Sequence, residues 1–227
     1  MKVFIGVPTS EFGRAAIFQD YLNQLIKPEG TVSRGFHTNS GAQNRNLIIE
    51  EARHHKCSHI LFIDDDMAFA PDSLMQLLSY DVNIVGGLYL NRGYPHLPVV
   101  FDYNSSSSMT RHSLKDNEKG LKEVGAVGFG FMLININVFN YMDRPYVRTG
   151  QIQKDLRSED IDFCIRARES GFTIHCDLSL PIGHIGLATF WPNMIDGKWH
   201  TAIDTNGNEL INTPQLISIN ELELISQ

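Results

Sequence analysis

The chain has 227 residues, of which 42% are hydrophobic and 20% are charged, and its formal net charge is -7. This length suits one globular domain over residues 1–227 with a substantial core. The negative charge argues against a nucleic-acid partner, because phosphate backbones attract basic surfaces, and no run of about eighteen apolar residues predicts a membrane span.

The first half of the chain alternates between apolar runs and helical periodicity. The apolar runs predict buried strands at 3–7, 60–63 and 82–85, the last closed by two glycines, with a short extended piece at 31–36. Apolar residues at helical spacing predict helices at 15–26, 41–53 and 71–78. This alternation predicts an α/β fold, a mainly parallel central sheet with helices on both of its faces.

In the second half the pattern fails between residues 102 and 120, where serines and mixed charges predict a mobile loop or flap. Strands are predicted again at 121–127, 131–136 and 172–177, with a short helix near Val138. Ser158 resembles an N-cap for a helix that Gly171 ends. A turn signal at 204–208 predicts that residues from about 187 to 227 form a C-terminal β-hairpin cap.

A cluster of acids follows the strand at 60–63, namely Asp64, Asp65 and Asp66. Side chains two residues apart point the same way where a strand ends, so Asp64 and Asp66 are expected to converge while Asp65 turns aside. Like charges this close repel each other, and a divalent cation that also bridges to phosphate oxygens is a natural partner. The alternative is a solvated acidic turn that precedes the helix at 71–78.

Three cysteines, an odd number without the spacing of a disulfide framework, indicate reduced thiols and a cytoplasmic location. The first eight residues do not resemble a signal peptide and are expected to form a core strand. The tract at 54–59 contains three histidines and one cysteine. No second cluster with the spacing of a structural zinc site accompanies it, so zinc is not favoured.

The carboxyl ends of parallel strands form the rim on which ligands bind in open α/β sheets. Asp64 and Asp66 belong to this rim, as do Pro8, Thr9 and Ser10 after the first strand. The loop at 8–10 is therefore a candidate for the pocket of a nucleotide base.

Four motifs appear in one order along the chain, at 40–46 (SGAQNRN), 63–67 (IDDDM), 127–134 (VGFGFMLI) and 158–164 (SEDIDFC). Together they resemble the nucleotide-sugar glycosyltransferases of the GT-A fold, close to the family-two type, over residues 1–186. This resemblance implies a three-layer α/β sandwich. The glycines near 128 have the wrong spacing for a dinucleotide-binding fingerprint.

The resemblance implies a metal site. In such enzymes the two acids of a DxD motif hold a divalent ion, Mn²⁺ or Mg²⁺, that bridges the donor diphosphate. Here these acids are Asp64, nearer the ribose, and Asp66, the more direct ligand. His184 fits the late histidine that completes the site and would favour Mn²⁺. The alternative for His184 is a histidine hydrogen-bonded to the backbone.

The resemblance also implies a base. The pair Glu159 and Asp160 matches the acids that accept the proton of the acceptor hydroxyl in inverting members. Asp160 is the first choice and Glu159 the second. The alternative is that both acids only favour the positive end of the helix dipole.

The remaining candidates are implied to bind substrate. Arg45 and Asn46 resemble a pair that faces the nucleotide, with a surface residue and its cap as the alternative, and Asp65 belongs to the same acidic run. A forked donor such as Arg92 suits phosphate or sugar. Gly128 and Gly130 would allow the donor sugar to approach the backbone closely. Phe129 lies where a small or hydroxylated residue is expected.

The expected function is thus transfer of a sugar from a UDP- or GDP-sugar to the hydroxyl of a glycan or other acceptor, with inversion. Two rival functions use the same acids. A metal-dependent nucleotidyltransferase or phosphohydrolase would release pyrophosphate or phosphate, and a non-catalytic nucleotide-sugar-binding module would bind donor without turnover.

Overall fold

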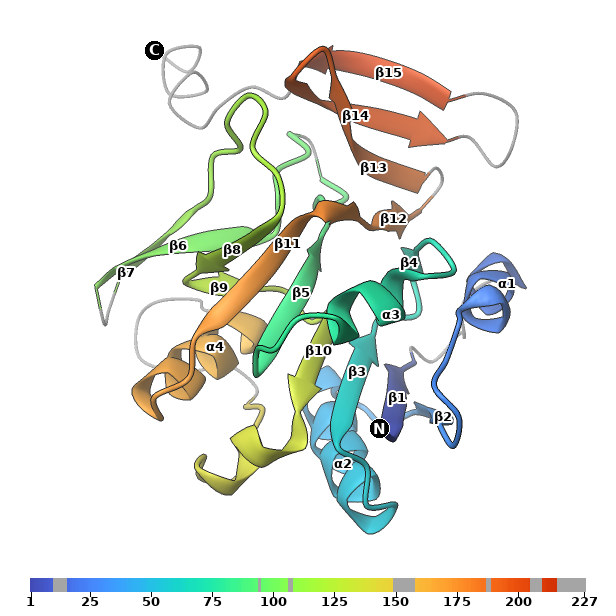
Figure 1. The fold of residues 1–227 in the computed structure, drawn as a ribbon, viewed down its shortest axis with the longest axis vertical. Helices are drawn as coiled ribbons and strands as arrows, with labels where there is room; N and C mark the ends of the chain where they lie inside the picture. The colour runs from blue at the N-terminus through green and yellow to red at the C-terminus, as the bar shows by residue number, and fades with distance from the viewer. Residues whose placement is uncertain are drawn as a thin grey trace.

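The computed structural model describes residues 1–9, 16–93, 95–105, 108–148, 158–186, 189–204 and 210–215. Within these residues the centre is a seven-stranded sheet of order β2-β1-β3-β10-β5-β11-β8 (Figure 1). Its strands, in chain order, are β1 Val3–Pro8, β2 Val32–Phe36, β3 His59–Ile63, β5 Ile84–Leu88, β8 Leu121–Val124, β10 Phe131–Asn135 and β11 Ile174–Pro181.

The central sheet is mixed. β1 lies parallel to β2 and β3, and β5 lies parallel to β11. In contrast, β10 runs antiparallel between β3 and β5, and β8 runs antiparallel to β11. The predicted α/β class is confirmed, and the sheet is only partly parallel because β10 in its centre and β8 at its edge run antiparallel to their neighbours.

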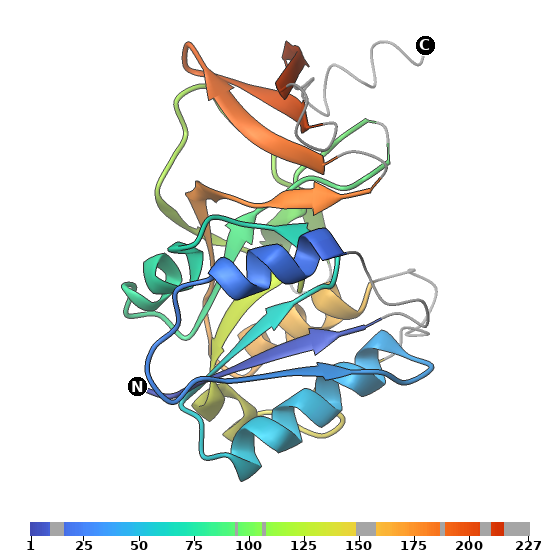
Figure 2. The ribbon, with the colours of Figure 1, turned by 90° about the vertical axis from the view of Figure 1, so that its right-hand side faces the viewer.

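Helices cover both faces of the sheet, as α1 and α2 show in Figure 2. α1 (Ala16–Gln24) and α3 (Ser73–Leu78) pack on one face, and α2 (Gly41–His54), the 3₁₀ helix η1 (Ile136–Asn140) and α4 (Glu159–Glu169) pack on the other. Side chains of β3 alternate between the two cores, because Ile60 and Phe62 face α2 while Leu61 and Ile63 join the α1 side. This is a three-layer arrangement. No helix in the described part combines the length and apolarity needed to span a membrane.

Two of the predicted strands differ from the observed ones in ways that glycines explain. Gly86 and Gly87 were expected to close a strand, but they lie inside β5, where a Cβ on Gly87 would be 2.6 Å from Ile182 Cγ1. Gly125 divides the predicted strand at 121–127 into β8 and β9 (Ala126–Val127). A Cβ on Gly125 would lie 2.7 Å from the backbone nitrogen of Tyr103, so the neighbouring strand passes closely there.

The mobile loop predicted from residue 102 is wrong over its first part. β6 (Val100–Ser105) and β7 (Ser108–Arg111) form an antiparallel hairpin, and β6 also pairs with β9. The serine-rich composition concealed the apolar residues Phe101 and Met109, which pack against the core.

A second sheet of order β15-β14-β13-β12-β4 begins directly after the acidic run. Its strands are β4 Met67–Ala68, β12 Gly183–Ile185, β13 Thr189–Ile195, β14 Lys198–Asp204 and β15 Leu210–Gln215. The antiparallel pairs β13–β14 and β14–β15 agree with the predicted C-terminal hairpin. The asparagine–glycine turn that predicted it lies outside the described residues.

After β7 the chain is held by a charged cluster around the buried ring of His112. His112 is 3% exposed, and its ring lies 2.9 Å from the Asp102 carboxylate and 3.0 Å from Glu118 Oε2. Glu118 Oε1 also pairs with Lys122. Both ring nitrogens of His112 face carboxylate oxygens, so the cluster fastens the 112–120 segment to β6 by charge-assisted bonds.

We expect this cluster to control acid stability. Burial raises the pKa of Glu118, but bonds from Lys122, the Lys115 N–H and His112 outweigh burial and lower it from 4.5 to about 2. Stability from this carboxylate is therefore present above the unfolded pKa and is lost as pH falls through about 2. Because solvent reaches this cluster and screens its charges, Glu118→Gln should remove about 1–2 kcal/mol of stability at neutral pH.

Denaturant unfolding at a series of pH values tests this expectation, since the variant should lose less stability than the wild type on acidification from 4.5 to 2. Glu123→Gln, at a side chain that is 55% exposed, is the matched control and should follow the wild type. Equal acid dependence in Glu118→Gln and the wild type would contradict the assigned role.

Candidate functional site

A cavity of about 420 Å³ opens where β1 and β3 end and α2 begins. Its walls come from the strand ends and from the start of α2, namely Pro8, Thr9, Asp64, Asp65, Asp66, Thr38, Asn39, Ser40, Gly41, Asn44 and Arg45. The rim expected from the direction of the strands is therefore present. Pro8 ends β1 instead of starting a loop, and Ser10 lies outside the described residues.

All three acids after β3 line this cavity, although Asp65 was expected to turn aside. The chain turns as soon as β3 ends, with the Met67 N–H bonded to the Asp64 carbonyl at 3.2 Å, so strand alternation no longer applies. Asp65 also lines an adjoining cavity of about 330 Å³ that it shares with Thr9.

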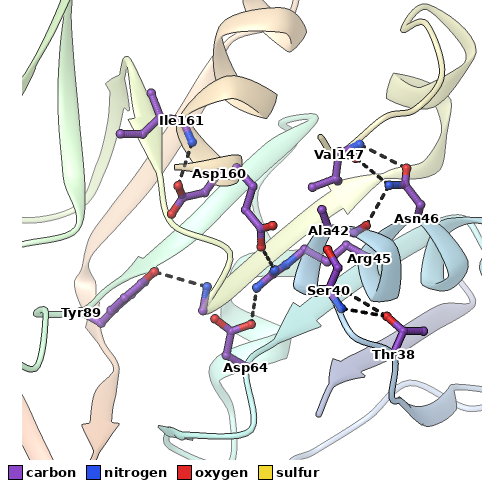
Figure 3. Close-up of polar contacts among 12 residues, drawn as sticks. Thr38, Ser40, Ala42, Arg45, Asn46, Asp64, Tyr89, Val147, Asp160 and Ile161 are labelled. Carbon is purple, nitrogen blue, oxygen red and sulfur yellow. Dashed lines mark hydrogen bonds and ion pairs between the residues drawn. The ribbon is translucent and has the colours of Figure 1, made fainter. Parts of the chain in front are cut away.

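Arg45 joins two of the predicted acids (Figure 3). Its Nη2 lies 2.5 Å from Asp64 Oδ1, and its Nη1 forms an ion pair with Glu159 Oε1. The guanidinium lies over the ring of Phe129, 4.8 Å from its centroid, and the Arg45 side chain is only 7% exposed. Arg45 thus connects the end of β3 to the first residue of α4, beyond the nucleotide-facing role that the resemblance implies.

The charges of Arg45, Asp64 and Glu159 shift one another's pKa values. Burial raises the pKa of Asp64 and of Glu159, and Arg45 opposes this rise without cancelling it. Burial lowers the pKa of Arg45, but Asp64 and Glu159 outweigh burial and raise it overall. The guanidinium is therefore charged and acts as the counter-ion of both carboxylates.

Asp160 follows Glu159 on α4, and its Oδ1 accepts a hydrogen bond of 2.9 Å from the Ile161 N–H (Figure 3). Burial raises the pKa of Tyr89 well above its usual value, and the charges of Asp160 and Asp64 add to this rise. The pKa of the buried Tyr89 phenol is thus raised by one acid from each of the two motifs. The structure brings the start of α4 and the end of β3 together, as the two sequence motifs require.

Asp66 faces His184 from the second sheet. His184 Nε2 lies 3.2 Å from Asp66 Oδ2, while Nδ1 lies 2.8 Å from the carbonyl of Leu90. A carbonyl only accepts, so Nδ1 carries a proton, and the lone pair of a neutral ring then faces the carboxylate. Either a proton or a cation must lie between these two atoms. Arg92 Nη2 lies 3.4 Å from the same Oδ2. Arg92, a candidate contact for phosphate or sugar, therefore lies next to Asp66.

The pair of Asp66 and His184 fits two neighbouring ligand positions of a divalent cation. Ligand bonds of about 2.1 Å at a right angle place two donor atoms about 3 Å apart, close to the observed separation. The Leu90 carbonyl orients the imidazole as an outer partner of a metal-bound histidine does. In the described part of the chain, however, no three His, Cys, Asp or Glu side chains form a metal-binding group. The expected set of three is thus not assembled, because Asp64 is bound to Arg45 instead.

Asn46 does not line the cavity. Its Nδ2 donates to the carbonyls of Ala42 and Val147 at 2.8 and 2.6 Å, and its Oδ1 accepts from the Val147 N–H at 3.2 Å (Figure 3). The side chain ties α2 to the segment that follows η1. The nucleotide contact that the resemblance implies for Asn46 has no counterpart in this geometry.

Gly128 and Gly130 make room for a protein side chain. A Cβ on Gly128 would lie 1.8 Å from Tyr89 Oη, and one on Gly130 would lie 2.5 Å from Met67 Cε. The Gly130 N–H also donates to Tyr89 Oη at 3.3 Å. Phe129 is buried between Phe62 and Phe163 beneath Arg45. A close approach was predicted for the donor sugar, but in the structure the Tyr89 ring makes it. The Phe129 ring packs under the Arg45 guanidinium.

We therefore expect Gly128→Ala to destabilise the fold by about 1–3 kcal/mol, because a buried aromatic ring cannot move aside without overpacking the core. Thermal unfolding measures the loss. Combining Gly128→Ala with Tyr89→Phe removes the nearest atom and should recover part of it. A melting temperature for Gly128→Ala equal to that of the wild type would contradict this packing.

Sequence reasoning missed Asn44. It is 2% exposed, lines the cavity, and its Oδ1 has no hydrogen-bond partner among the described residues. A buried polar atom without a partner is costly, and a ligand with a hydrogen-bond donor would satisfy it. Helical spacing offered a signal, since positions 41, 44 and 45 share one face of α2 and Arg45 was already a candidate.

No protein-family description matches the chain, and no curated protein is similar to it in sequence. Among solved structures it is similar to A197 from STIV, with 15% identity and a TM-score of 0.56 over 96% of this chain and 98% of that one. The catalytic domain of Drosophila beta1,4-galactosyltransferase 7, in complex with xylobiose, gives 17% identity and a TM-score of 0.45 over 78% and 64% of the two chains.

A putative glucose-1-phosphate thymidylyltransferase from Bacillus anthracis, in complex with a sucrose, gives 14% identity and a TM-score of 0.41 over 79% and 69%. At these identities the likeness is one of fold alone. The chain has a mixed α/β fold with a partly parallel central sheet, and it shares its overall fold with A197 from STIV.

Proposed function

We propose that the chain is a metal-dependent glycosyltransferase that moves a sugar from a nucleotide-sugar donor to an acceptor hydroxyl with inversion. The observation that supports this most is that Arg45, which lines the cavity beside the acids at 64–66, pairs with both Asp64 and Glu159 and so holds the second acidic motif next to the first. A transferase needs donor-binding acids and a base on one rim, and sequence positions 64–66 and 159–160 supply both kinds of group. Buried free thiols at Cys57, Cys164 and Cys176 support a cytoplasmic location.

The residues divide the work as follows. The cavity of about 420 Å³ has the size of a small-molecule site, and Thr9 and Asn44 offer it polar contacts. Asp64, with 29% of its side chain exposed, is suited to accept a hydrogen bond from a ribose hydroxyl. Asp66 and His184 would hold Mn²⁺ or Mg²⁺, which when bound neutralises charge on the leaving diphosphate. Asp160 accepts the proton of the acceptor hydroxyl, which is too weakly acidic to attack unaided.

Thermal shift with a panel of UDP-, GDP- and other nucleotide sugars, with and without Mn²⁺, tests donor binding. A ligand that binds only the folded state raises the melting temperature, so one base should stand out and depend on the metal. Asn44→Leu should reduce this shift, because its buried amide then no longer meets the donor, whereas Asn104→Leu on the β6–β7 hairpin should not.

Product analysis by mass spectrometry then decides the reaction class. A released nucleoside diphosphate together with a glycosylated acceptor supports the transferase. Pyrophosphate or phosphate as product would assign a nucleotidyltransferase or phosphohydrolase instead. Binding of donor without turnover over a broad acceptor panel would leave a nucleotide-sugar-binding module.

A further inference from the structure

The guanidinium of Arg45 pairs with Glu159, which lies 114 residues away in sequence, and also with Asp64. We call the set of Asp64, Arg45 and Glu159 the Arg45 bridge. Asp64 directly follows β3 on the donor side of the cavity, and Glu159 begins α4, one residue before Asp160. The bridge therefore spans from the donor-binding rim to the helix that carries the base.

The bridge is enclosed on both sides. Phe129 lies below the guanidinium, 4.8 Å away. A Cβ on Gly41 would lie 3.0 Å from Arg45 Nη1 and 3.0 Å from Glu159 Oε1, so a larger residue there would press on the ion pair. Arg45 Nε is buried with no hydrogen-bond partner among the described residues. Nη1 and Nη2 of Arg45 each bind one carboxylate, while its Nε makes no hydrogen bond to a described residue.

The two ends of α4 are anchored in different ways. At its middle, Phe163 and Cys164 are buried in the core, and near its C-terminal end Arg168 donates to the Val124 carbonyl at 3.0 Å. At its start, the side chain of the N-cap Ser158 makes no capping hydrogen bond. The ion pair of Glu159 with Arg45 therefore ties the first turn, and with it Asp160, to β3.

We propose that Arg45 is a positioning residue, which holds the first turn of α4 against the end of β3 and thereby sets the place of Asp160 relative to bound donor. Its catalytic consequence rests on the proposed function. Glu159 then serves as the partner of Arg45, and Asp160 alone serves as the base. Lysine cannot replace Arg45, because a single ammonium does not present a planar fork to two carboxylates at once.

Hydrogen exchange of the intact chain tests the structural half without any substrate. In Arg45→Lys, amides in the first turns of α4 should exchange at least about tenfold faster, since local opening then costs less. Glu159→Gln should have the same effect at the same amides, and it serves as the second variant where Arg45→Lys does not fold. Arg144→Lys, which alters an exposed pair with Glu50, is the matched control and should exchange as the wild type does. Unchanged exchange in α4 for both bridge variants would overturn the proposal.

Kinetics with the donor found in the panel tests the catalytic half. Arg45→Lys should lower kcat by about 100-fold, the usual cost of a small misplacement, while affinity for Mn²⁺ with UDP or GDP changes less than about threefold. Glu159→Gln should lower kcat similarly, and the double variant no further, because both substitutions break one unit. Additive losses, or a loss confined to nucleotide affinity, would overturn positioning in favour of direct donor contact.

The two proposals fail in different ways. A wild-type chain that transfers no sugar from any donor rejects the proposed function and the role of Asp160 as base. Hydrogen exchange in α4 still decides whether Arg45 holds this helix in place.

Discussion

Asp160→Asn is expected to lower kcat by about 10³-fold, with little change in donor affinity. A positioned general base contributes about 10²- to 10⁴-fold, and an amide cannot accept the proton of the acceptor hydroxyl. The fold should survive, because the substituted side chain keeps the oxygen that accepts the Ile161 N–H at 2.9 Å. Initial rates at saturating donor and acceptor, together with calorimetric donor binding, measure the two effects separately.

Glu169→Gln is the control for this substitution. It makes the same acid-to-amide change at the exposed end of α4 and should retain the wild-type rate. If Asp160→Asn kept full activity and Glu159→Gln lost it, the base would be Glu159, and the Arg45 bridge would then require another explanation.

His184→Gln is expected to weaken Mn²⁺-dependent nucleotide binding by about 100-fold. The imidazole Nε2 faces Asp66 at 3.2 Å, and the Leu90 carbonyl orients the ring at 2.8 Å. Glutamine is a weak ligand for Mn²⁺ and does not restore this geometry. Titration of Mn²⁺ into the chain with UDP or GDP, followed by calorimetry, measures the affinity.

His54→Gln, at an exposed histidine near the end of α2, is the matched control and should bind Mn²⁺ as the wild type does. Binding in His184→Gln that keeps its full metal dependence would remove His184 from the site. The contact with Asp66 would then be a structural ion pair.

Much of the fold could be predicted because local patterns carry it. The apolar run before Asp64 marks β3, and Ser158 with its acidic successors marks the start of α4 at Glu159. The rule that strand ends form a ligand rim then places Asp64 and Pro8 at one cavity, as the structure has them.

The remainder depends on tertiary contacts that no local pattern encodes. The direction of β10 follows from its neighbours β3 and β5, and its apolar residues would suit either direction. The glycines at 128 and 130 suggested ligand approach, whereas the side chains that fill their space are those of Tyr89, which follows β5, and Met67. Arg45 meets Glu159 only because α2 and α4 share one face of the sheet.

The antiparallel entry of β10 also governs how the chain assembles. β3 and β5 belong to one sheet only through β10, which lies between them. β10 is synthesised about forty residues after β5. A nascent chain that ends before residue 131 therefore leaves one edge of β3 unpaired and β5 without either of its partners in the sheet, and other chains can join these edges. Completion of the sheet waits for contacts between remote parts of the sequence, so folding is slow compared with that of helical proteins of similar size.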